Sequence, residues 1–383
     1  MRRLLPLAIL AIALASCEKD DVVDNGGGNN VTAPADSPNL PETPYNYANL
    51  NLPNYLLNGP VDAADNTPNN NPVTNDGATL GRVLFYDVNL SHNKTVACGS
   101  CHAPSKGFSD DLAFSVGFEG GLTGRHSMGL ANAAYYANGR FFWDERAATL
   151  EDQVLQPIQD SVEMGMTLDS VVARVSTASY YPELFENAFG DNQVTEDRIS
   201  RALAQFVRSM VSYQTPFDVG RAQVANLNDP FPNFSALENQ GKGIFFGGRG
   251  GCAPCHGTEA FIAPTARNNG LDLNTSADQG LGDVTGNPAD NGKFKVNSLK
   301  NIAVTAPYMH DGRFATLEDV IDHYSTGVQD HPNLDPALRV GGNGAPNNRN
   351  FNQNEKDALI AFLNTLTDQA MMDDDKYADP FVE

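Results

Sequence analysis

The chain has 383 residues, which is enough for two domains with separate hydrophobic cores. Its 47 acidic and 25 basic side chains give a formal net charge of −22, which argues against nucleic acid and against anionic lipid as partners of the protein surface. A hydrophobic content of 41% is ordinary for a globular protein, so the acidity favours either a basic partner protein or solubility alone.

The N-terminus has the pattern of a targeting segment that ends in a cysteine. Two arginines precede an apolar stretch, 4–15, which is too short for a permanent membrane helix. Residues 14–17, Leu-Ala-Ser-Cys, resemble a bacterial lipobox, which implies cleavage before Cys17 and lipidation of its thiol. The alternative is an ordinary secretory signal with an incidental cysteine. We expect a signal peptide at 1–17 and a protein of the periplasm or cell envelope that reaches a membrane only through this lipid.

The rest of the chain divides by composition. Residues 18–45 are rich in Gly, Asn, Asp and Pro and offer too little apolar surface to fold, which predicts a flexible tether. The Pro- and Asn-containing stretch 215–232 has the composition of a domain boundary. We therefore predict an N-terminal domain at 46–228 and a C-terminal domain at 229–383.

Helix signals occur in both predicted domains. In the first, residues 80–85 and the apolar spacing in 168–189 and 195–213 predict helices. Thr149 stands at an N-cap position, because two acidic residues follow where the helix dipole favours negative charge.

In the second domain, a capping box at 235–238 predicts a helix that ends near Phe246. Thr316 is the expected N-cap of a helix through Tyr324, and 354–366 is amphipathic. No series of strands stands out in either domain, so we predict a mainly α fold.

One motif, C-x-x-C-H, occurs at 98–102 and again at 252–256. It is the attachment signature of c-type haem, in which two thiols form thioether bonds and the histidine ligates the iron. A shared zinc site would need the cysteine pairs close together, but they lie 154 residues apart (252 − 98), each with its own histidine. We predict two covalently bound haem c groups, with attachment cysteines Cys98, Cys101, Cys252 and Cys255 and proximal ligands His102 and His256.

The chain also contains an internal repeat. Residues 143–152, Trp-Asp-Glu-Arg-Ala-Ala-Thr-Leu-Glu-Asp, match residues 310–319, His-Asp-Gly-Arg-Phe-Ala-Thr-Leu-Glu-Asp, at an offset of 167 (310 − 143). This offset is close to the spacing of the two haem motifs. It indicates two haem domains of common ancestry.

These motifs together resemble the bacterial dihaem cytochrome c peroxidases and their relative MauG, over about residues 77–367. Besides the haem motifs, the resemblance rests on Phe142-Trp143-Asp144, Thr-Leu-Glu-Asp-Gln at 149–153, Pro-Ile-Gln-Asp-Ser-Val-Glu-Met at 157–164, Lys-Val-Asn-Ser-Leu-Lys-Asn-Ile at 295–302, Thr-Ala-Pro-Tyr-Met-His-Asp-Gly at 305–312 and Asp-His-Tyr at 322–324. It implies two cytochrome c-like helical domains in tandem, the first peroxidatic and the second an electron-transfer domain.

The resemblance also implies roles for single residues. Trp143 takes the place of the tryptophan between the haems, and Gln153 and Glu163 take the places of residues that line the peroxide pocket. His310 matches a histidine near the second haem. A calcium ion between the domains would bind the carbonyl groups of Thr305 and Pro307.

The sixth ligand of the second haem is a methionine in the peroxidases and a tyrosine in MauG. The matching position, fourteen residues after His310, is Tyr324. This favours a His/Tyr haem like that of MauG. Met309 is the alternative, since a thioether is a frequent partner of histidine in c-type haems.

The chain departs from the family pattern at two positions. Phe118 stands where many peroxidases have a histidine that must leave the iron before peroxide binds. His126 replaces an asparagine that binds the calcium, which puts that ion in doubt, and a distal-ligand role for His126 is an alternative.

The residues themselves support an open first iron. Subtracting the repeat offset from Tyr324 gives Pro157, which has no ligand atom. A carboxylate such as Glu163 can carry the proton that moves between the two peroxide oxygens, whereas Gln153 can only orient by hydrogen bonding. The alternative for Glu163 is a surface carboxylate. Trp143 is either an electron relay or a packed core residue.

We therefore predict a dihaem peroxidase that reduces hydrogen peroxide to water. Its electrons would come from a small donor protein of the cytochrome c or cupredoxin type and pass through the second haem. One alternative is MauG-like, peroxide-dependent oxidation of a protein or organic substrate, and another is a non-catalytic electron-transfer cytochrome. A homodimer is compatible with the sequence.

Overall fold

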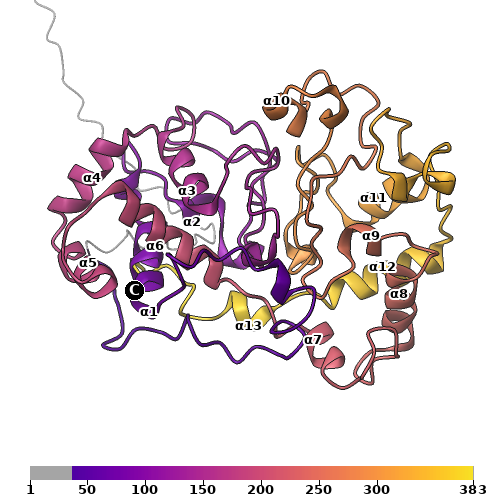
Figure 1. Ribbon diagram of the computed structural model, residues 1–383, viewed down its shortest axis with the longest axis horizontal. Coiled ribbons are helices and arrows are strands. Elements are labelled where there is room, and N and C mark those ends of the chain that lie inside the picture. Colours follow the sequence, from indigo (N-terminus) through magenta and orange to yellow (C-terminus); the bar gives the residue numbers. More distant parts are fainter. Residues whose placement is uncertain (1–36, 383) are drawn as a thin grey trace, which may run out of the picture. The chain divides into compact units, whose positions relative to one another are not determined.

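The computed structural model describes residues 37–382, and within them the chain is helical with long irregular connections (Figure 1). In these residues the β structure consists of isolated bridges, which confirms the mainly α prediction. The α-helices are α1 (Asn75–Tyr86), α2 (Cys98–Cys101), α3 (Leu150–Gln159), α4 (Leu168–Thr177), α5 (Tyr181–Phe189), α6 (Glu196–Ser209), α7 (Pro216–Arg221), α8 (Ala236–Phe246), α9 (Ala253–His256), α10 (Leu281–Thr285), α11 (Leu317–Asp322), α12 (Gln353–Asn364) and α13 (Gln369–Met372).

The predicted caps begin the helices as expected. The Thr149 hydroxyl accepts from the Asp152 amide at the start of α3, and Thr316 does the same for Asp319 at the start of α11. Ser235 and Glu238 form the capping box of α8. In each case the side chain satisfies an amide that has no partner within the helix.

Three helical predictions differ from the structure, and one of them is the pattern over 195–213, whose helix α6 ends at Ser209. The apolar pattern over 168–189 is divided into α4 and α5, because the backbone turns extended at Ala178 and Pro182 stands in the first turn of α5. The helix expected to run through Tyr324 ends at Asp322 and continues as a π-helical turn, His323–Gly327.

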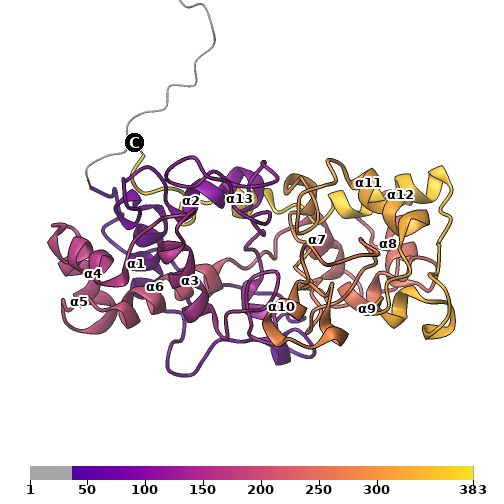
Figure 2. The ribbon, with the colours of Figure 1, turned by 90° about the horizontal axis from the view of Figure 1, so that it is seen from above.

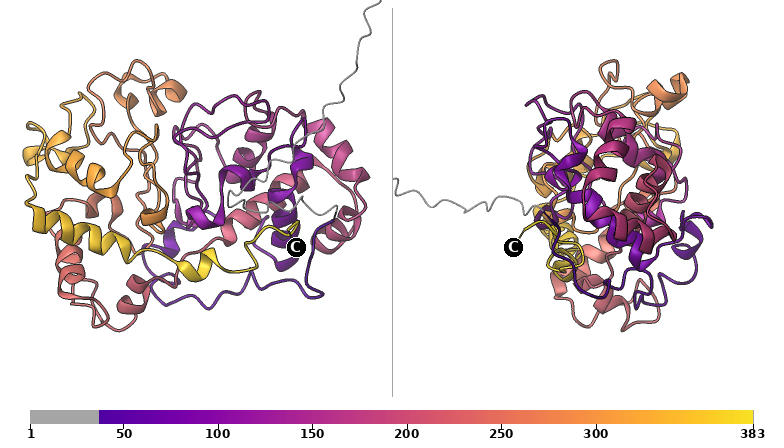
Figure 3. Two further views of the ribbon diagram at one scale, coloured as in Figure 1. Left: turned by 180° about the vertical axis from the view of Figure 1, so that it is seen from behind. Right: turned by 90° about the vertical axis from the view of Figure 1, so that its left-hand side faces the viewer.

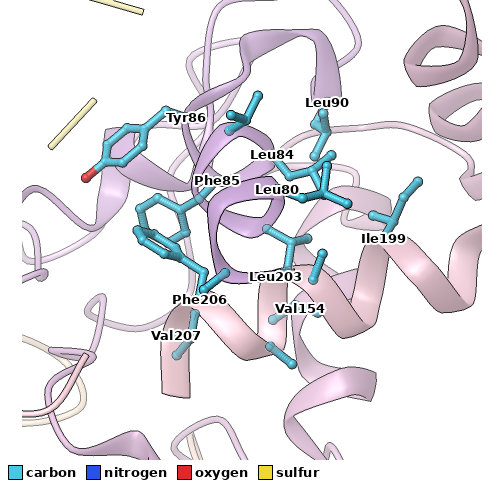
Figure 4. Packing of buried hydrophobic residues seen from close by; sticks show 14 of the residues in the cluster. Leu80, Leu84, Phe85, Tyr86, Leu90, Val154, Ile199, Leu203, Phe206 and Val207 are labelled. Carbon is cyan, nitrogen blue, oxygen red and sulfur yellow. The ribbon is translucent and has the colours of Figure 1, made fainter. Parts of the chain in front are cut away.

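Each half of the described chain has its own hydrophobic core, with α1 to α6 in one half and α8 to α12 in the other (Figures 1 and 2). In the first core α1 crosses α6, with Leu80, Leu84 and Phe85 against Leu203 and Phe206 (Figure 4). In the second core α8 packs against α12 in the same way. Two separate cores are what two haem-binding units require.

Glycines let both helix pairs approach closely. A Cβ atom on Gly81 of α1 would overlap the Ala202 carbonyl of α6, and one on Gly241 of α8 would overlap the Ala358 carbonyl of α12. The internal repeat is visible in the loops as well, because antiparallel bridges join 141 to 147 and 308 to 314, again 167 residues apart (308 − 141). The halves are therefore built on one plan.

The two ends of the described chain both pack on the first core. Leu40 and Tyr45, within the predicted tether, lie against it, and the Asn39 amide donates to the Pro380 carbonyl. Past α13, Tyr377 and Phe381 are buried in the same core, so the C-terminal segment returns to the first half (Figure 3). Apolar side chains at both ends account for this packing. We therefore propose a shorter tether than the predicted 18–45, one that ends before Asn39.

We propose that the two domains divide near residue 228, as predicted. The segment past α13 is the exception, because it packs in the core of the first domain. The predicted signal peptide and Cys17 lie outside the described residues. Within the described part of the chain, no helix combines the length and apolarity needed to cross a bilayer.

We expect Gly81→Ala and Gly241→Ala each to lower the free energy of unfolding by ~1–3 kcal/mol, because the added methyl group would push the paired helices apart. Urea unfolding of the haem-loaded protein, followed by circular dichroism, measures this. Gly243→Ala is the matched control on α8, since its Cβ would meet nothing within 4 Å, and alanine favours a helix by up to ~1 kcal/mol. Equal stability of Gly241→Ala and Gly243→Ala would contradict the packing argument.

Candidate functional site

Both C-x-x-C-H motifs form short helices whose histidine rings are held in one orientation. The Nδ1 of His102 lies 2.9 Å from the Phe108 carbonyl, and the Nδ1 of His256 lies 2.9 Å from the Phe261 carbonyl. Because a carbonyl can only accept, Nδ1 carries the proton and the lone pair is on Nε2. Each imidazole is therefore prepared to ligate iron through Nε2.

The two carbonyl groups are presented by the same backbone conformation. Phe108 has φ 61° and Phe261 has φ 57°, both in the left-handed region that bulky residues rarely adopt. Burial lowers the pKa of both imidazoles, that of His256 to about 4, so both rings are neutral near pH 7. A neutral imidazole is the form that binds a metal.

The second motif opens on a cavity whose lining fits a haem. Besides Cys252, Cys255 and His256, the lining is rich in apolar side chains: Phe245, Leu299, Leu317, Ile321, Leu359 and Leu363. Arg267 and Arg349 also line it, and each has a buried Nε with no hydrogen-bond partner among residues 37–382. An apolar macrocycle with two carboxylates would pack against the apolar side chains, and its carboxylates would accept hydrogen bonds from the two arginines.

The first motif opens on a cavity that contains the residues predicted for a peroxide pocket. Gln153, Pro157 and Glu163 line it together with Cys98, Cys101 and His102. Burial raises the pKa of Glu163 to about 7; Asp160 adds to this effect and Arg146 opposes it. A carboxyl group with such a pKa can accept and return a proton near neutral pH.

Phe118 supplies no ligand to this cavity. Its ring packs 5.8 Å from that of His92, and a Cβ on Gly165 would overlap it. The position at which many peroxidases have a removable histidine is thus a packed phenyl ring. A phenyl ring has no atom that could ligate iron.

Trp143 lies between the two cavities and lines both. Its indole Nε1 donates to the His126 carbonyl at 2.8 Å, and its own carbonyl accepts from the Lys295 amide at 2.8 Å. One of these partners belongs to the first half and the other to the second. The residue predicted as a relay is therefore fixed from both halves, its side chain by the first and its backbone by the second.

A buried ionic network surrounds this junction. Arg125 donates to Asp144 at 2.6 Å and, through two nitrogens, to Asp278 at 2.9 and 2.8 Å. His310 lies 3.8 Å from Asp278 and stacks on Phe294 with the ring centroids 3.7 Å apart. His310 also lines the second cavity, close to where it was expected.

Tyr324 and Met309 both line the second cavity, so the structure keeps both as candidates for the sixth position. Tyr324 stands on the π-helical turn, a feature frequent at functional sites. Met309 has φ 76°, and its sulfur accepts from the Asn269 side chain at 3.5 Å. Burial raises the pKa of Tyr324 and a side-chain hydrogen bond with Asn269 lowers it, so the contact with Asn269 does not separate the two residues. We propose Tyr324 as the ligand because it matches the family position and stands on the π-helical turn.

His126 is held by hydrogen bonds at both ring nitrogens. Its Nε2 lies 3.1 Å from the Ser109 hydroxyl and its Nδ1 3.0 Å from the Leu112 carbonyl. The residue lines both cavities, and Thr305 and Pro307, the residues expected to bind calcium, line the second one with it.

Comparison with known proteins places this arrangement in a family. A family model for di-haem cytochrome c peroxidase matches residues 75–224. The methylamine utilization protein MauG of Methylorubrum extorquens is 35% identical over 302 residues, which are 78% of this chain and 80% of that protein. The chain belongs to the dihaem cytochrome c peroxidase and MauG family.

Two further relatives agree with this assignment. The cytochrome c551 peroxidase of Nitrosomonas europaea is 34% identical, and the match covers 77% of this chain and 81% of that protein. A solved structure of a MauG-like protein associated with microbial copper homeostasis has a TM-score of 0.73 at 31% identity, and the match covers 87% of this chain and 99% of that one. As a family member, the protein is a peroxidase-type oxidoreductase with two c-type haems.

Sequence reasoning missed several residues that shape the site. The carbonyl groups of Phe108 and Phe261 carry no side-chain signal, although each phenylalanine follows its motif at a similar distance. Arg267 and Arg349 are far apart in sequence and match no motif. Lys295 was noted only as part of a motif, yet its side chain lines both cavities.

We expect Tyr324→Phe to open the second iron, shift that haem toward high spin and raise its potential, because a phenolate stabilises the ferric state. Optical and electron paramagnetic resonance spectra with redox titration measure these changes, and mass spectrometry checks that both haems stay attached. Met309→Leu is the control and should leave the spin state, the potential and the haem attachment unchanged. A spectrum altered by Met309→Leu and not by Tyr324→Phe would reverse the assignment.

Proposed function

We propose that this protein reduces hydrogen peroxide at the first haem site, with electrons that arrive through the second. The observation that carries the proposal is the lining of the first cavity, where Glu163 and Gln153 share one space with His102 and where Pro157 offers no ligand. Cys98, Cys101 and His102 would hold a haem, which would supply redox-active iron and the capacity to store oxidising equivalents.

Glu163 performs the proton transfer in this scheme. In its carboxylate form it takes a proton from one peroxide oxygen and returns it to the other, which then leaves as water. Gln153 orients the peroxide through its side-chain amide. Reduction of one peroxide to two waters consumes two protons and two electrons, and the electrons come from a small redox protein.

Trp143 connects the two sites in the same scheme. Trp143 lines both cavities, and its indole is held by the His126 carbonyl and its backbone by the Lys295 amide, so it can lose and regain an electron with little movement. Tyr324 and His256 would hold the second iron, with Arg267 and Arg349 as partners of the haem carboxylates. The net charge of −22 favours a basic donor protein, of the cytochrome c or cupredoxin type.

Glu163→Gln should lower the rate of reaction with peroxide by a factor of ~10²–10⁴, because an amide cannot accept a proton. In the native protein the rate should rise as pH increases through about 7, since below its raised pKa Glu163 is protonated. Stopped-flow rates from pH 5 to 9 measure both effects.

The matched control is Glu119→Gln, which removes an exposed carboxylate from a nearby loop and should keep the native rate and pH profile. A Glu163→Gln variant with an unchanged inflection near pH 7 would show that another group carries the proton.

A second function, peroxide-dependent oxidation of a protein or organic substrate, is favoured by one observation. Tyr324 lines the second cavity, as expected for a MauG-like His/Tyr haem, and a MauG-like protein is among the solved structures with a similar fold. A phenolate at the second iron would let that haem share oxidising equivalents with the first.

Steady-state peroxide consumption distinguishes the two functions. Rapid turnover with reduced small cytochromes or cupredoxins supports the peroxidase. Slow consumption with these donors, together with persistence of the oxidised state for minutes until a target protein is added, would favour substrate oxidation and contradict our first proposal.

We further propose that Cys17 carries lipid and holds the protein at a membrane of the cell envelope. The lipobox pattern at 14–17 supports this proposal. Cys17→Ser should move the protein from the membrane fraction to the soluble fraction with both haems attached, and unchanged membrane association would contradict the anchor.

A further inference from the structure

The junction between the halves contains a buried imidazole where the family resemblance implies a calcium ion. His126 is 5% exposed, and its two ring nitrogens contact Leu112 and Ser109. Its backbone amide donates to the His310 carbonyl of the second half, and Thr305 of that half lines the second cavity with it. One residue therefore joins groups of both halves, as a bound cation would.

The groups at this place do not fit calcium. Calcium takes six to eight oxygen ligands, usually including carboxylates, and imidazole nitrogen is not among its preferred donors. Asp110, a carboxylate close enough to act on the imidazole, already accepts from the Ser115 hydroxyl and the Leu112 amide.

The backbone of His126 ties the same place to both haem sites. Its amide donates to the His310 carbonyl at 2.8 Å, which joins it to the second half. Its carbonyl accepts from the Trp143 indole at 2.8 Å. The position of the indole between the cavities therefore depends on where the His126 backbone is held, and the ring contacts hold it.

We propose that the His126 imidazole takes the place of the calcium ion that the family resemblance implies, so that the protein assembles its two haem sites without calcium. His126 is then a positioning residue, which acts on Trp143 through its backbone carbonyl. The part that concerns electron transfer rests on the relay function proposed for Trp143, whereas the part that concerns the metal does not.

The test starts from the haem-loaded protein, supplied with calcium chloride and then treated with EGTA. We expect elemental analysis to find no calcium above background and the ferric spectrum to be the same before and after EGTA. Trp143 is the only tryptophan, so its ultraviolet resonance Raman bands report the indole hydrogen bond directly. These bands should not respond to calcium or to EGTA.

His126→Asn supplies an amide oxygen in place of the imidazole and should bind about one calcium ion per protein. Its indole bands should resemble the native bands with calcium and shift after EGTA. His331→Asn is the matched control, because His331 is also buried, with Asn268 and Thr275 as its partners, and should gain no calcium.

One calcium ion in the native protein, with spectra that change on its removal, would overturn the proposal. A folded His126→Asn variant that binds no calcium and keeps the native indole bands would overturn it too, because the imidazole would then replace nothing. Metal content and Raman bands require no turnover, so they decide this point whether or not the protein proves to be a peroxidase.

Discussion

The hydrogen bond from each proximal histidine to a phenylalanine carbonyl is the constraint on which both haem sites depend. The distance from Nδ1 to the carbonyl oxygen is 2.9 Å in both halves. Because Nδ1 is engaged in this bond, Nε2 is the nitrogen that can ligate iron. The carbonyl reaches the ring because Phe108 and Phe261 accept a left-handed backbone conformation. That conformation is held by the two cores, where glycines bring α1 against α6 and α8 against α12.

From this shared plan the two halves diverge at equivalent positions of the repeat. Tyr324 can close the second iron, whereas Pro157, at the same place in the first repeat, cannot close the first. We infer that this single difference separates a site open to peroxide from a site reserved for electrons. Trp143, held by His126 on one side and Lys295 on the other, lies where the two sites meet.

Much of this organisation could be predicted from the sequence, because it is coded by side chains at short spacing. The haem motifs, the caps at Thr149 and Thr316 and the capping box at Ser235 are local patterns, and the structure contains each of the predicted helix starts. The family resemblance predicted that Glu163 and Gln153 line one pocket, and their spacing in the sequence alone does not predict this.

The remainder depends on contacts that no local pattern encodes. The π-helical turn at 323–327 and the carbonyl of Phe261 are backbone features, and the guanidinium group of Arg349 approaches the second cavity from a loop 93 residues beyond His256 (349 − 256). His126 was visible as a departure from the family, but only the fold shows that its ring bonds to the first half and its amide to the second.

The central claim is that two similar haem sites differ in one ligand, which leaves the first iron open. Electron paramagnetic resonance of the fully ferric, haem-loaded protein, with and without peroxide, tests this directly. The account predicts one five-coordinate, high-spin haem and one low-spin haem, with the high-spin signal lost on adding peroxide and no need for prior reduction. Two low-spin haems that ignore peroxide until the protein is reduced would contradict it.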